Sequence, residues 1–383
     1  MCNCGAYADT MVDVESTHGA NTIYDILVGS AWAGLDLQRD DGSFPPGRNY
    51  TYDEPETPVR TTSHWLNILT KSFEITAEEQ FEEAAHRAID YLLTDEIRPS
   101  GYTYHCRKID SKDKCNGLVG QAAPIQALTR ASDVFDRDGA QQTAEEVFSV
   151  HPFDDGLGLW ERVEIDGTPL SFDRTLNHQI IFAAAGTGLL PTSDRVESQI
   201  ERFLDTLQAN MRTHADGLIK HYVRPPVSKI LRSVLDSPHR YDMLINEAVF
   251  HYYSYSKDRR KKERGYQTVN LEALSRLRSA FPAHKFWESE KIISALEFLR
   301  ANEDELLAGI KTKHGSLIQG VNTAKIRHRF ENKPLEDLRH LLTEDIVVET
   351  GGNLNVFGLD EVDENTQAAL VSSLTDIPDV KIN

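Results

Sequence analysis

Apolar residues recur at spacings of three and four along most of the chain, which is the pattern of amphipathic α-helices. The clearest case is residues 81–93, where Phe81, Ala84, Ala88 and Leu92 fall on one face. The same period predicts helices over 21–37, 58–73, 116–135, 139–148, 174–189, 194–211, 265–281 and 284–299, with a short one within 241–255. The pattern therefore predicts an all-α protein.

Glycine-containing loops recur before these helices. Their glycines stand at 42, 101, 156, 217 and 315, so the intervals are 59, 55, 61 and 98 residues. A repeat of long loop, helix, short turn and helix is typical of helical hairpins stacked around a ring, since each hairpin buries its face only against its neighbours. We predict an (α/α) toroid of about five to six helical hairpins, with the long loops on one face and the helices that follow them forming an inner ring. An ordinary multi-helix bundle is the alternative.

The fourth unit and the chain ends depart from the repeat. Residues 222–239 contain Pro225, Pro226 and Pro238 and are predicted to be loop. The basic run 256–264 is interpreted as a solvated loop, with capture of a phosphate-linked or uronic substrate as the alternative. After Ala324 the pattern fades. The expected division is an N-terminal segment (1–20), the toroid (21–325) and an acidic C-terminal extension (326–383).

The charge and the apolar runs bear on location and partners. The net charge is -19, from 60 acidic and 41 basic residues, and such a surface repels nucleic acid. The first residues lack the basic region and apolar core of a secretory signal, and the longest apolar stretch, 180–190, falls short of the roughly 20 residues of a membrane span. We expect a cytoplasmic protein without a transmembrane segment; nothing in the sequence indicates its oligomeric state.

No cofactor is expected, since no metal or nucleotide motif is found. The four cysteines are interpreted as unpaired thiols, and a zinc site built from all four is the alternative.

Hydrogen-bonding side chains gather where the predicted inner helices begin. The stretch Asp173-Arg174-Thr175-Leu176-Asn177-His178-Gln179 leads directly into an apolar run. Buried amides and imidazoles cost several kcal/mol unless they are paired, so an internal network or a bound polar ligand must meet them. Amides both donate and accept hydrogen bonds, as sugar hydroxyls require. We interpret this stretch as one wall of a carbohydrate pocket.

Side chains of similar chemistry lie at or near the other predicted helix starts. Arginine suits a carboxylate, and an aromatic ring can stack on a sugar face, although surface ion pairs and core packing are the respective alternatives. The predicted substrate-binding set is Arg60, His64, Trp65, Asn116, Gln121, Trp160, Arg174, Asn177, Gln179, Arg264, Tyr266 and Asn270.

Three motifs carry a resemblance to a known family: Asn116-Gly117-Leu118-Val119-Gly120-Gln121, Thr175-Leu176-Asn177-His178-Gln179 and Glu263-Arg264-Gly265-Tyr266-Gln267-Thr268-Val269-Asn270. Over roughly residues 20–320 the chain resembles the six-hairpin (α/α) toroid glycosidase superfamily. The likeness is to members that act on uronic acids or in glycan assembly: unsaturated glucuronyl hydrolases, glucuronyl epimerase catalytic domains and glycosidase-like proteins of archaeal N-glycosylation pathways. The resemblance implies a sugar bound at the loop side of the inner ring, free or linked to a lipid or phosphate.

Two kinds of chemistry fit such a pocket. Glycoside hydrolysis needs two carboxyl groups, one as acid and one as base or nucleophile. The candidates are Asp41, Asp173 and Asp242, for which helix capping is the alternative. Uronate epimerisation instead needs a base beside the proton alpha to the sugar carboxylate. His178 is the candidate, a satisfied core histidine being its alternative. Hydrolysis of a uronic-acid-containing glycan is the first expectation; epimerisation or isomerisation in glycan assembly, or glycan binding without catalysis, are the others.

Overall fold

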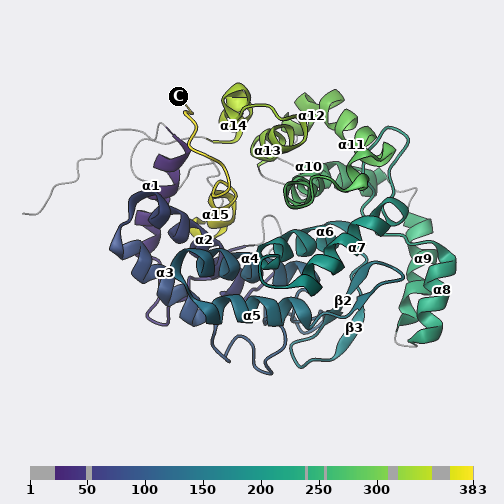
Figure 1. Cartoon of the computed structure of the whole chain (residues 1–383), viewed down its shortest axis with the longest axis horizontal. Coiled ribbons are helices and arrows are strands. Elements are labelled where there is room, and N and C mark those ends of the chain that lie inside the picture. Colours follow the sequence, from purple (N-terminus) through teal and green to yellow (C-terminus); the bar gives the residue numbers. More distant parts are fainter. Residues whose placement is uncertain are drawn as a thin grey trace, which may run out of the picture.

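A computed structural model describes residues 22–48, 54–237, 240–253, 257–308, 318–346 and 363–382. Its helices form a ring around a central axis (Figure 1). Consecutive inner helices pack side by side: α15 (Glu364–Ser372), α2 (Val59–Thr76), α4 (Gly117–Phe135), α6 (Leu176–Ala185), α10 (Lys257–Ala280) and α13 (Gln319–Glu331). The predicted all-α toroid is confirmed.

A second layer of helices covers the inner ring from outside. It consists of α1 (Ile23–Leu35), α3 (Glu79–Leu92), α5 (Asp138–Ser149), α7 (Asp194–Asn210), α11 (Glu290–Ala301) and α14 (Arg339–Asp345). Most of these follow an inner helix in sequence and pack back against it, as α3 does against α2 and α5 against α4. The short helix α12 (Glu303–Ala308) follows α11.

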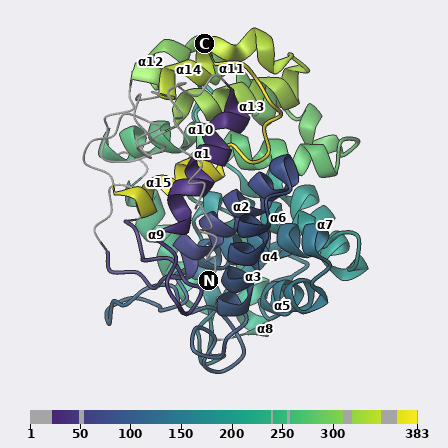
Figure 2. The same ribbon diagram turned by 90° about the vertical axis from the view of Figure 1, so that its left-hand side faces the viewer.

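The first and last segments that the structure describes meet and complete the ring. Thr22 forms an antiparallel bridge with Lys381, and the Ile23 amide donates to the Val380 carbonyl at 3.0 Å. Helix α1 therefore lies beside α15 (Figure 2). The boundary expected at residue 325 falls inside α13, and α13 to α15 lie within the ring rather than beyond it. Their apolar positions are separated by long polar segments, so the helical period was not visible in the sequence.

Buried charges join the last inner helices. Lys325 of α13 binds Glu272 of α10 at 2.9 Å and Asp376, just after α15, at 2.8 Å. Burial would raise the pKa of Glu272, but Arg276 and Lys325 lower it to about 2. Because Lys325 of α13 binds carboxylates from both α10 and the segment that follows α15, these ion pairs hold the ring closed.

Each described glycine loop is fastened to the inner helix that follows it. The backbone amides of Phe44, Tyr104, Trp160 and Ile219 donate, respectively, to side-chain oxygens of Thr62, Gln121, Gln179 and Gln267, at 2.7 to 3.1 Å. These residues stand two or three positions after Gly42, Gly101, Gly158 and Gly217, all of which have positive φ. We call these four bonds the loop clamps. The third glycine is Gly158 rather than the expected Gly156, and Gly315 lies outside the described residues.

Glycine is required in these loops for a second reason. A Cβ at Gly42 would lie 2.1 Å from the carbonyl oxygen of Arg87 in α3, and one at Gly217 would lie 2.0 Å from that of Ser294 in α11. Those distances are too short for non-bonded atoms, so only glycine lets the loop pass between the inner helix and the outer helix.

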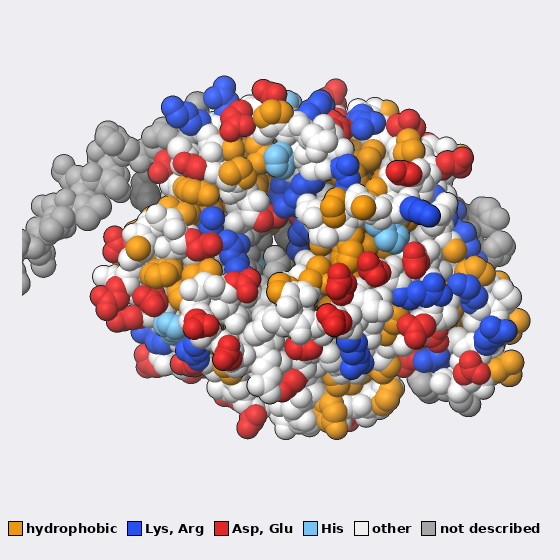
Figure 3. Space-filling model, in the orientation of Figure 1, with side chains coloured by type: hydrophobic (Ala, Val, Ile, Leu, Met, Phe, Trp, Pro, Cys, Tyr) orange, Lys and Arg blue, Asp and Glu red, His pale blue; other side chains and the backbone are white. Residues whose placement is uncertain are grey.

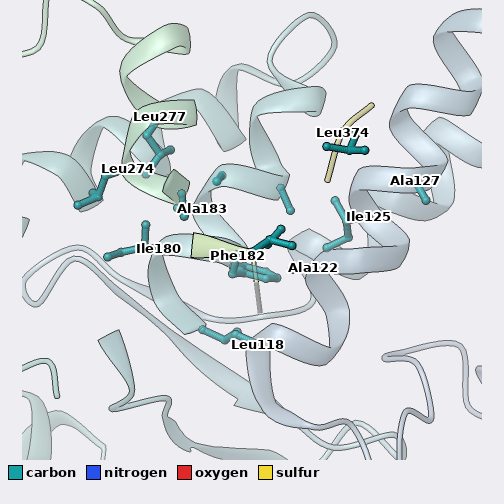
Figure 4. Close-up of a cluster of buried hydrophobic side chains, with 14 of the residues drawn as sticks. Leu118, Ala122, Ile125, Ala127, Ile180, Phe182, Ala183, Leu274, Leu277 and Leu374 are labelled. Atoms are coloured by element: carbon teal, nitrogen blue, oxygen red, sulfur yellow. The ribbon is translucent and has the colours of Figure 1, made fainter. Parts of the chain in front are cut away.

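The core lies between the inner and outer layers and among the inner helices. Figure 4 shows Ile125 of α4, Phe182 of α6 and Leu274 of α10 in one apolar cluster that also includes Leu374. Trp160 contacts Phe148, Phe182 and Phe203, which links α5, α6 and α7. Cys106 and Cys115 are buried free thiols, whereas Cys2 and Cys4 lie outside the described residues. No described helix is long and apolar enough to pass through a lipid bilayer.

The third and fourth units hold the main departures from the sequence prediction. The loop before α6 forms an antiparallel sheet of β1 (Phe153–Asp154), β2 (Leu159–Val163) and β3 (Pro169–Phe172). Residues expected to be loop include helix α8 (Val227–Asp236), which begins directly after Pro226, a position where proline does not interrupt hydrogen bonding. Helix α9 (Asp242–Tyr253) follows, and the basic run forms the start of α10 rather than a loop.

We expect the loop clamp at Gln179 to contribute far more to the free energy of unfolding than an exposed glutamine does. Gln179 accepts from the Trp160 amide and donates to the carbonyls of Trp160 and Asp173 at 2.8 and 2.9 Å. Replacing Gln179 with alanine leaves all three groups buried without a partner and should lower the free energy of unfolding by about 2–4 kcal/mol. Urea denaturation measures the change. Gln208→Ala, at an exposed position of α7, is the matched control and should stay within about 0.5 kcal/mol of wild type; equal losses in both variants would contradict the clamp.

Candidate functional site

Asp173 and His178 form a hydrogen-bonded pair at the start of α6. The His178 Nδ1 and Asp173 Oδ2 atoms are 2.9 Å apart. Asp173 is buried and also accepts the backbone amides of Leu118 at 3.3 Å and Thr175 at 3.2 Å. His178 is partly exposed, with 28% of its side chain accessible, so its ring remains open to a ligand. The pair has the geometry of a histidine oriented by a carboxylate.

The pKa of Asp173 shows which groups surround it. Burial alone would raise this pKa, but the charge and hydrogen bond of His178, together with Arg162 and the Thr175 amide, lower it to about 2. Asp173 is therefore ionised across the physiological pH range. An ionised carboxylate is a strong hydrogen-bond acceptor, so Asp173 fixes the orientation of the His178 ring.

His221, a residue the sequence reasoning missed, joins this pair. Residues 221–223 run antiparallel to 174–176: the Leu176 amide donates to the His221 carbonyl at 2.9 Å, and Thr175 bridges Tyr222. Burial lowers the pKa of His221 well below its ordinary value, and Lys262, Arg259 and His178 lower it further. The site therefore holds one histidine paired with a carboxylate and a second one that stays neutral.

Glu263 of α10 holds the loop that carries His221. One carboxylate oxygen accepts the His221 amide at 3.0 Å, and the other lies 2.7 Å from Nε2 of His214. Glu263 stands next to Arg264, which the sequence predicts to bind substrate. Because α10 begins at Lys257, Glu263 is already two turns inside the helix and buried, whereas Arg264 points outward to Asn302 and Glu305.

Cationic and aromatic side chains surround His221. Its ring contacts Tyr222 and Tyr266, with centroids 4.9 and 5.6 Å away. Arg259 lies over the Tyr222 ring and Lys262 over the Tyr266 ring, at 4.6 and 5.7 Å. A small cavity beside this group is lined by His214, Lys220, Tyr222, Arg224, Phe250, Arg259 and Glu263. His178 and Asp173 do not line that cavity; His221, between Lys220 and Tyr222 in sequence, connects the two.

A network of charged side chains surrounds Arg162, one of the cations that lower the pKa of Asp173. Asp113 binds Arg107 at 2.6 Å and Arg162 at 2.9 Å, and Arg107 also donates to Asn116 Oδ1 at 3.0 Å. Asn116 adopts a left-handed conformation directly before α4. Its side chain therefore orients Arg107, and with it the cationic neighbours of Asp173.

The inner helices also carry buried oxygen atoms that lack a protein partner. Among the described residues these include Asn67 Oδ1 of α2, Asn177 Oδ1 of α6, Asn270 Oδ1 of α10 and Thr323 Oγ1 of α13. The molecule is hollowed near the centre of the ring, where Lys and Arg side chains border the opening (Figure 3). Buried acceptors that no protein group satisfies need water or ligand donors.

Several predicted site residues have other roles. Trp65 and Trp160 are fully buried, so neither presents a face to a sugar, and Gln121 and Gln179 form loop clamps. Arg174 is buried against the Val223 carbonyl and Glu247, so its charge is satisfied by the protein itself.

The remaining candidates lie apart from the Asp173–His178 pair. Arg60 binds Glu56 at 2.6 Å, and burial together with Arg60 lowers the pKa of the neighbouring His64 to about 3. Asp41 accepts the amide and hydroxyl of Ser43 in an exposed turn. Asp242 opens α9. Within the part of the chain that the structure describes, neither Asp41 nor Asp242 hydrogen-bonds to Asp173.

Comparison with known proteins identifies the family. No protein-family model matches the chain. The chain is 38% identical over 368 residues to Archaeal glycosylation protein Q of Haloferax volcanii, which covers 94% of this chain and 99% of that protein. The chain belongs to the archaeal glycosylation protein Q family.

Solved structures show that the fold of this glycosylation protein Q relative is shared widely. A sugar epimerase from a ruminal bacterium superimposes with a TM-score of 0.59 at 9% identity, covering 94% of this chain and 100% of that one. An unsaturated glucuronyl hydrolase specific for heparin gives 0.55 at 10% identity, covering 92% and 95%. An α-1,6-mannanase variant of Salegentibacter sp. HEL1_6 bound to α-1,6-mannotriose gives 0.51 at 12% identity, covering 92% and 98%. The chain has the fold of sugar epimerases and glycosidases, as the resemblance predicted.

The ion pair of Asp173 predicts a pH-dependent stability. The carboxyl pKa is about 4 in an unfolded chain and about 2 here, so the stabilisation is complete above pH 4 and is lost as the pH falls towards 2. Asp173→Asn should lower the free energy of unfolding by about 2 kcal/mol at neutral pH, and the difference from wild type should narrow in acid. Urea unfolding at several pH values measures it. Asp155→Asn, in an exposed turn, is the control and should follow wild type. A difference between Asp173→Asn and wild type that grows in acid would contradict the assignment.

Proposed function

We propose that this protein epimerises or isomerises a uronic acid residue during glycan assembly, by proton transfer at the carbon next to the sugar carboxylate. The observation that carries the proposal is the Asp173–His178 pair beside a neutral His221. A histidine hydrogen-bonded to a carboxylate, next to a second histidine in a different environment, offers one candidate acid and one candidate base. Membership of the glycosylation protein Q family supports a role in glycan assembly.

In the reaction we propose, one histidine removes a proton from the sugar and the other returns one. Neutral His221 removes the proton alpha to the carboxylate, and the bonding electrons move into the carbonyl system as an enolate. His178, oriented by Asp173, acts as the acid and returns a proton to the opposite face of that carbon. One proton leaves and one arrives, so the product is the stereoisomer, and solvent exchange resets the two imidazoles.

Cations near His221 suit the charge that this reaction creates. The enolate carries a second negative charge beside the carboxylate, and fixed cations in a site with little water lower its energy. Arg259 and Lys262 lie over the two tyrosine rings that contact His221, and Lys220 and Arg224 line the adjoining cavity. Burial and the neighbouring Arg259 lower the pKa of Lys262, an arrangement that an anionic ligand would relieve.

Hydrolysis, the first expectation from the sequence, fits this arrangement less well. It requires two carboxyl groups that face the glycosidic bond, about 5 to 10 Å apart. Asp113 is held by Arg107 and Arg162, and Glu263 is held by His214 and the His221 amide. Asp41 and Asp242 lie on other elements. Within the described residues, the pair at His178 and His221 offers the better-placed acid and base.

The substrate we propose is a saccharide that carries a uronate, either free or attached to a lipid or phosphate carrier. The unpaired oxygens of Asn177 and Asn270 supply acceptors for sugar hydroxyls. Tyr222 and Tyr266 present rings next to His221. We expect the reaction to take place in the cytoplasm.

Isotope exchange tests the proposal directly. In heavy water, wild-type protein incubated with uronic-acid oligosaccharides should incorporate one deuterium at the carbon next to the carboxylate, detectable by NMR and mass spectrometry. His178→Ala and His221→Ala should each lower the exchange rate by at least about 100-fold while substrate affinity changes only a few-fold. His86→Ala, on the outer helix α3, is the matched control and should exchange at the wild-type rate.

Each other result has a definite meaning. Release of a free sugar without deuterium at that carbon would replace epimerisation with hydrolysis. Binding by calorimetry without product or exchange would make this a glycan-binding protein. Full activity in both histidine variants would remove them from the mechanism.

A further inference from the structure

Helices α8 and α9 expose two continuous apolar stripes. On α8 the stripe is Val227, Leu231 and Leu235, at spacings of four residues, and Leu235 is 83% exposed. The second stripe consists of Tyr241, directly before α9, and of Ile245, Val249 and Tyr252 on α9; the two tyrosines are 60% and 78% exposed. Single exposed apolar residues are ordinary, but two aligned rows on adjacent helices indicate a surface with a partner.

The opposite faces of the same helices hold the pair against the toroid. Ser233 of α8 donates to Asp154 at 3.1 Å, and Lys229 donates to the Gly156 carbonyl at 2.9 Å. On α9, Glu247 binds Arg174 and Arg224, and Met243 is buried. The orientation of the helices is thus fixed by their polar and buried contacts. The stripes are left on the outside, at the edge of the ring where Figure 1 shows α8 and α9.

We propose that this α8–α9 face docks on the surface of a membrane that contains anionic lipids. Five aliphatic side chains with a tyrosine at each end of the α9 row match the composition of a shallow interfacial insertion, in which aromatic residues sit at headgroup level. The proposal does not depend on the reaction assigned above.

Charge supports a lipid partner. The protein carries a net charge of -19, yet the chain that follows α9 begins α10 with Lys257, Arg259, Arg260, Lys261 and Lys262. Lys257 and Lys261 are exposed. Figure 3 shows hydrophobic side chains next to Lys and Arg at this edge of the molecule. A local basic region beside an apolar face attracts anionic headgroups, while the acidic remainder of the surface keeps other orientations away.

The size of the face argues against a second copy of the chain as its partner. Helices of 10 and 12 residues are about 15 and 18 Å long, and two lying side by side are about 20 Å wide. A symmetric pair would therefore bury roughly 600–700 Å², which is below the roughly 1,200 Å² of a stable interface. Shallow insertion into a membrane has no such minimum area, because each apolar side chain that enters the lipid contributes by itself.

Vesicle sedimentation of the full chain tests the proposal. Wild-type protein should sediment with phosphatidylglycerol vesicles and much less with vesicles of phosphatidylcholine alone. The double variant Leu231→Ser/Leu235→Ser should lower the partition coefficient by at least about tenfold, because both side chains leave the lipid phase. Ile293→Ser, at a 47% exposed position of α11, is the matched control and should bind as wild type does.

Charge-reversal variants measure the electrostatic contribution to vesicle binding. Lys257→Glu/Lys261→Glu should weaken binding to phosphatidylglycerol several-fold and leave the weak binding to phosphatidylcholine unchanged, whereas Lys285→Glu, an exposed lysine elsewhere, should have little effect. Equal sedimentation of wild type and the double-serine variant would overturn the proposal. A second result would also overturn it: wild type forms a dimer in solution and does not bind vesicles, and the double-serine variant is monomeric. The face would then join two copies of the chain.

Discussion

The loop clamp is the interaction on which the rest of the structure depends. In each of four described units a left-handed glycine turns the loop, and a side chain from the inner helix accepts a hydrogen bond from the buried loop amide that follows. A buried amide without a partner is costly, so the loop has one stable position relative to the helix start. At Gln179 the same side chain also holds the Asp173 carbonyl. The geometry of the Asp173–His178 pair is therefore set by the bond that builds the fold.

The sequence predicted the ring because its signals are local and periodic. Glycine spacing and helical period identify hairpins without any knowledge of contacts. The same signals gave wrong predictions where a local sequence is compatible with both a loop and a helix. Pro225 and Pro226 indicated a loop, but a proline just before a helix is also a good start, and α8 begins at Val227. The basic run indicated solvation, but a strongly charged first turn does not prevent a helix that is buried further along, as α10 is from Glu263 onward.

The candidate site was predictable only in part, because a buried polar side chain does not reveal its partner. Asn177, His178 and Gln179 all stand at one helix start and looked alike. In the structure Gln179 meets backbone, His178 meets Asp173, and Asn177 Oδ1 meets no described protein group. His221 and Glu263 could not be paired from sequence, since 42 residues separate them and their contact arises only when the strand-like segment 221–223 lies along 174–176.

The irregular fourth unit explains the long glycine interval and connects the candidate site to the exposed α8–α9 face. Helices α8 and α9 are inserted between the Gly217 loop and α10, which lengthens that interval to 98 residues. The inward side of α9 supplies Glu247, which binds Arg174, the residue next to Asp173. The outward side carries the apolar stripe. Because Glu247 and Arg174 are joined by an ion pair, the position of the α8–α9 face and the position of Asp173 are fixed by the same contact. If both proposals hold, a lipid-carried substrate would dock one helix away from the candidate base His221.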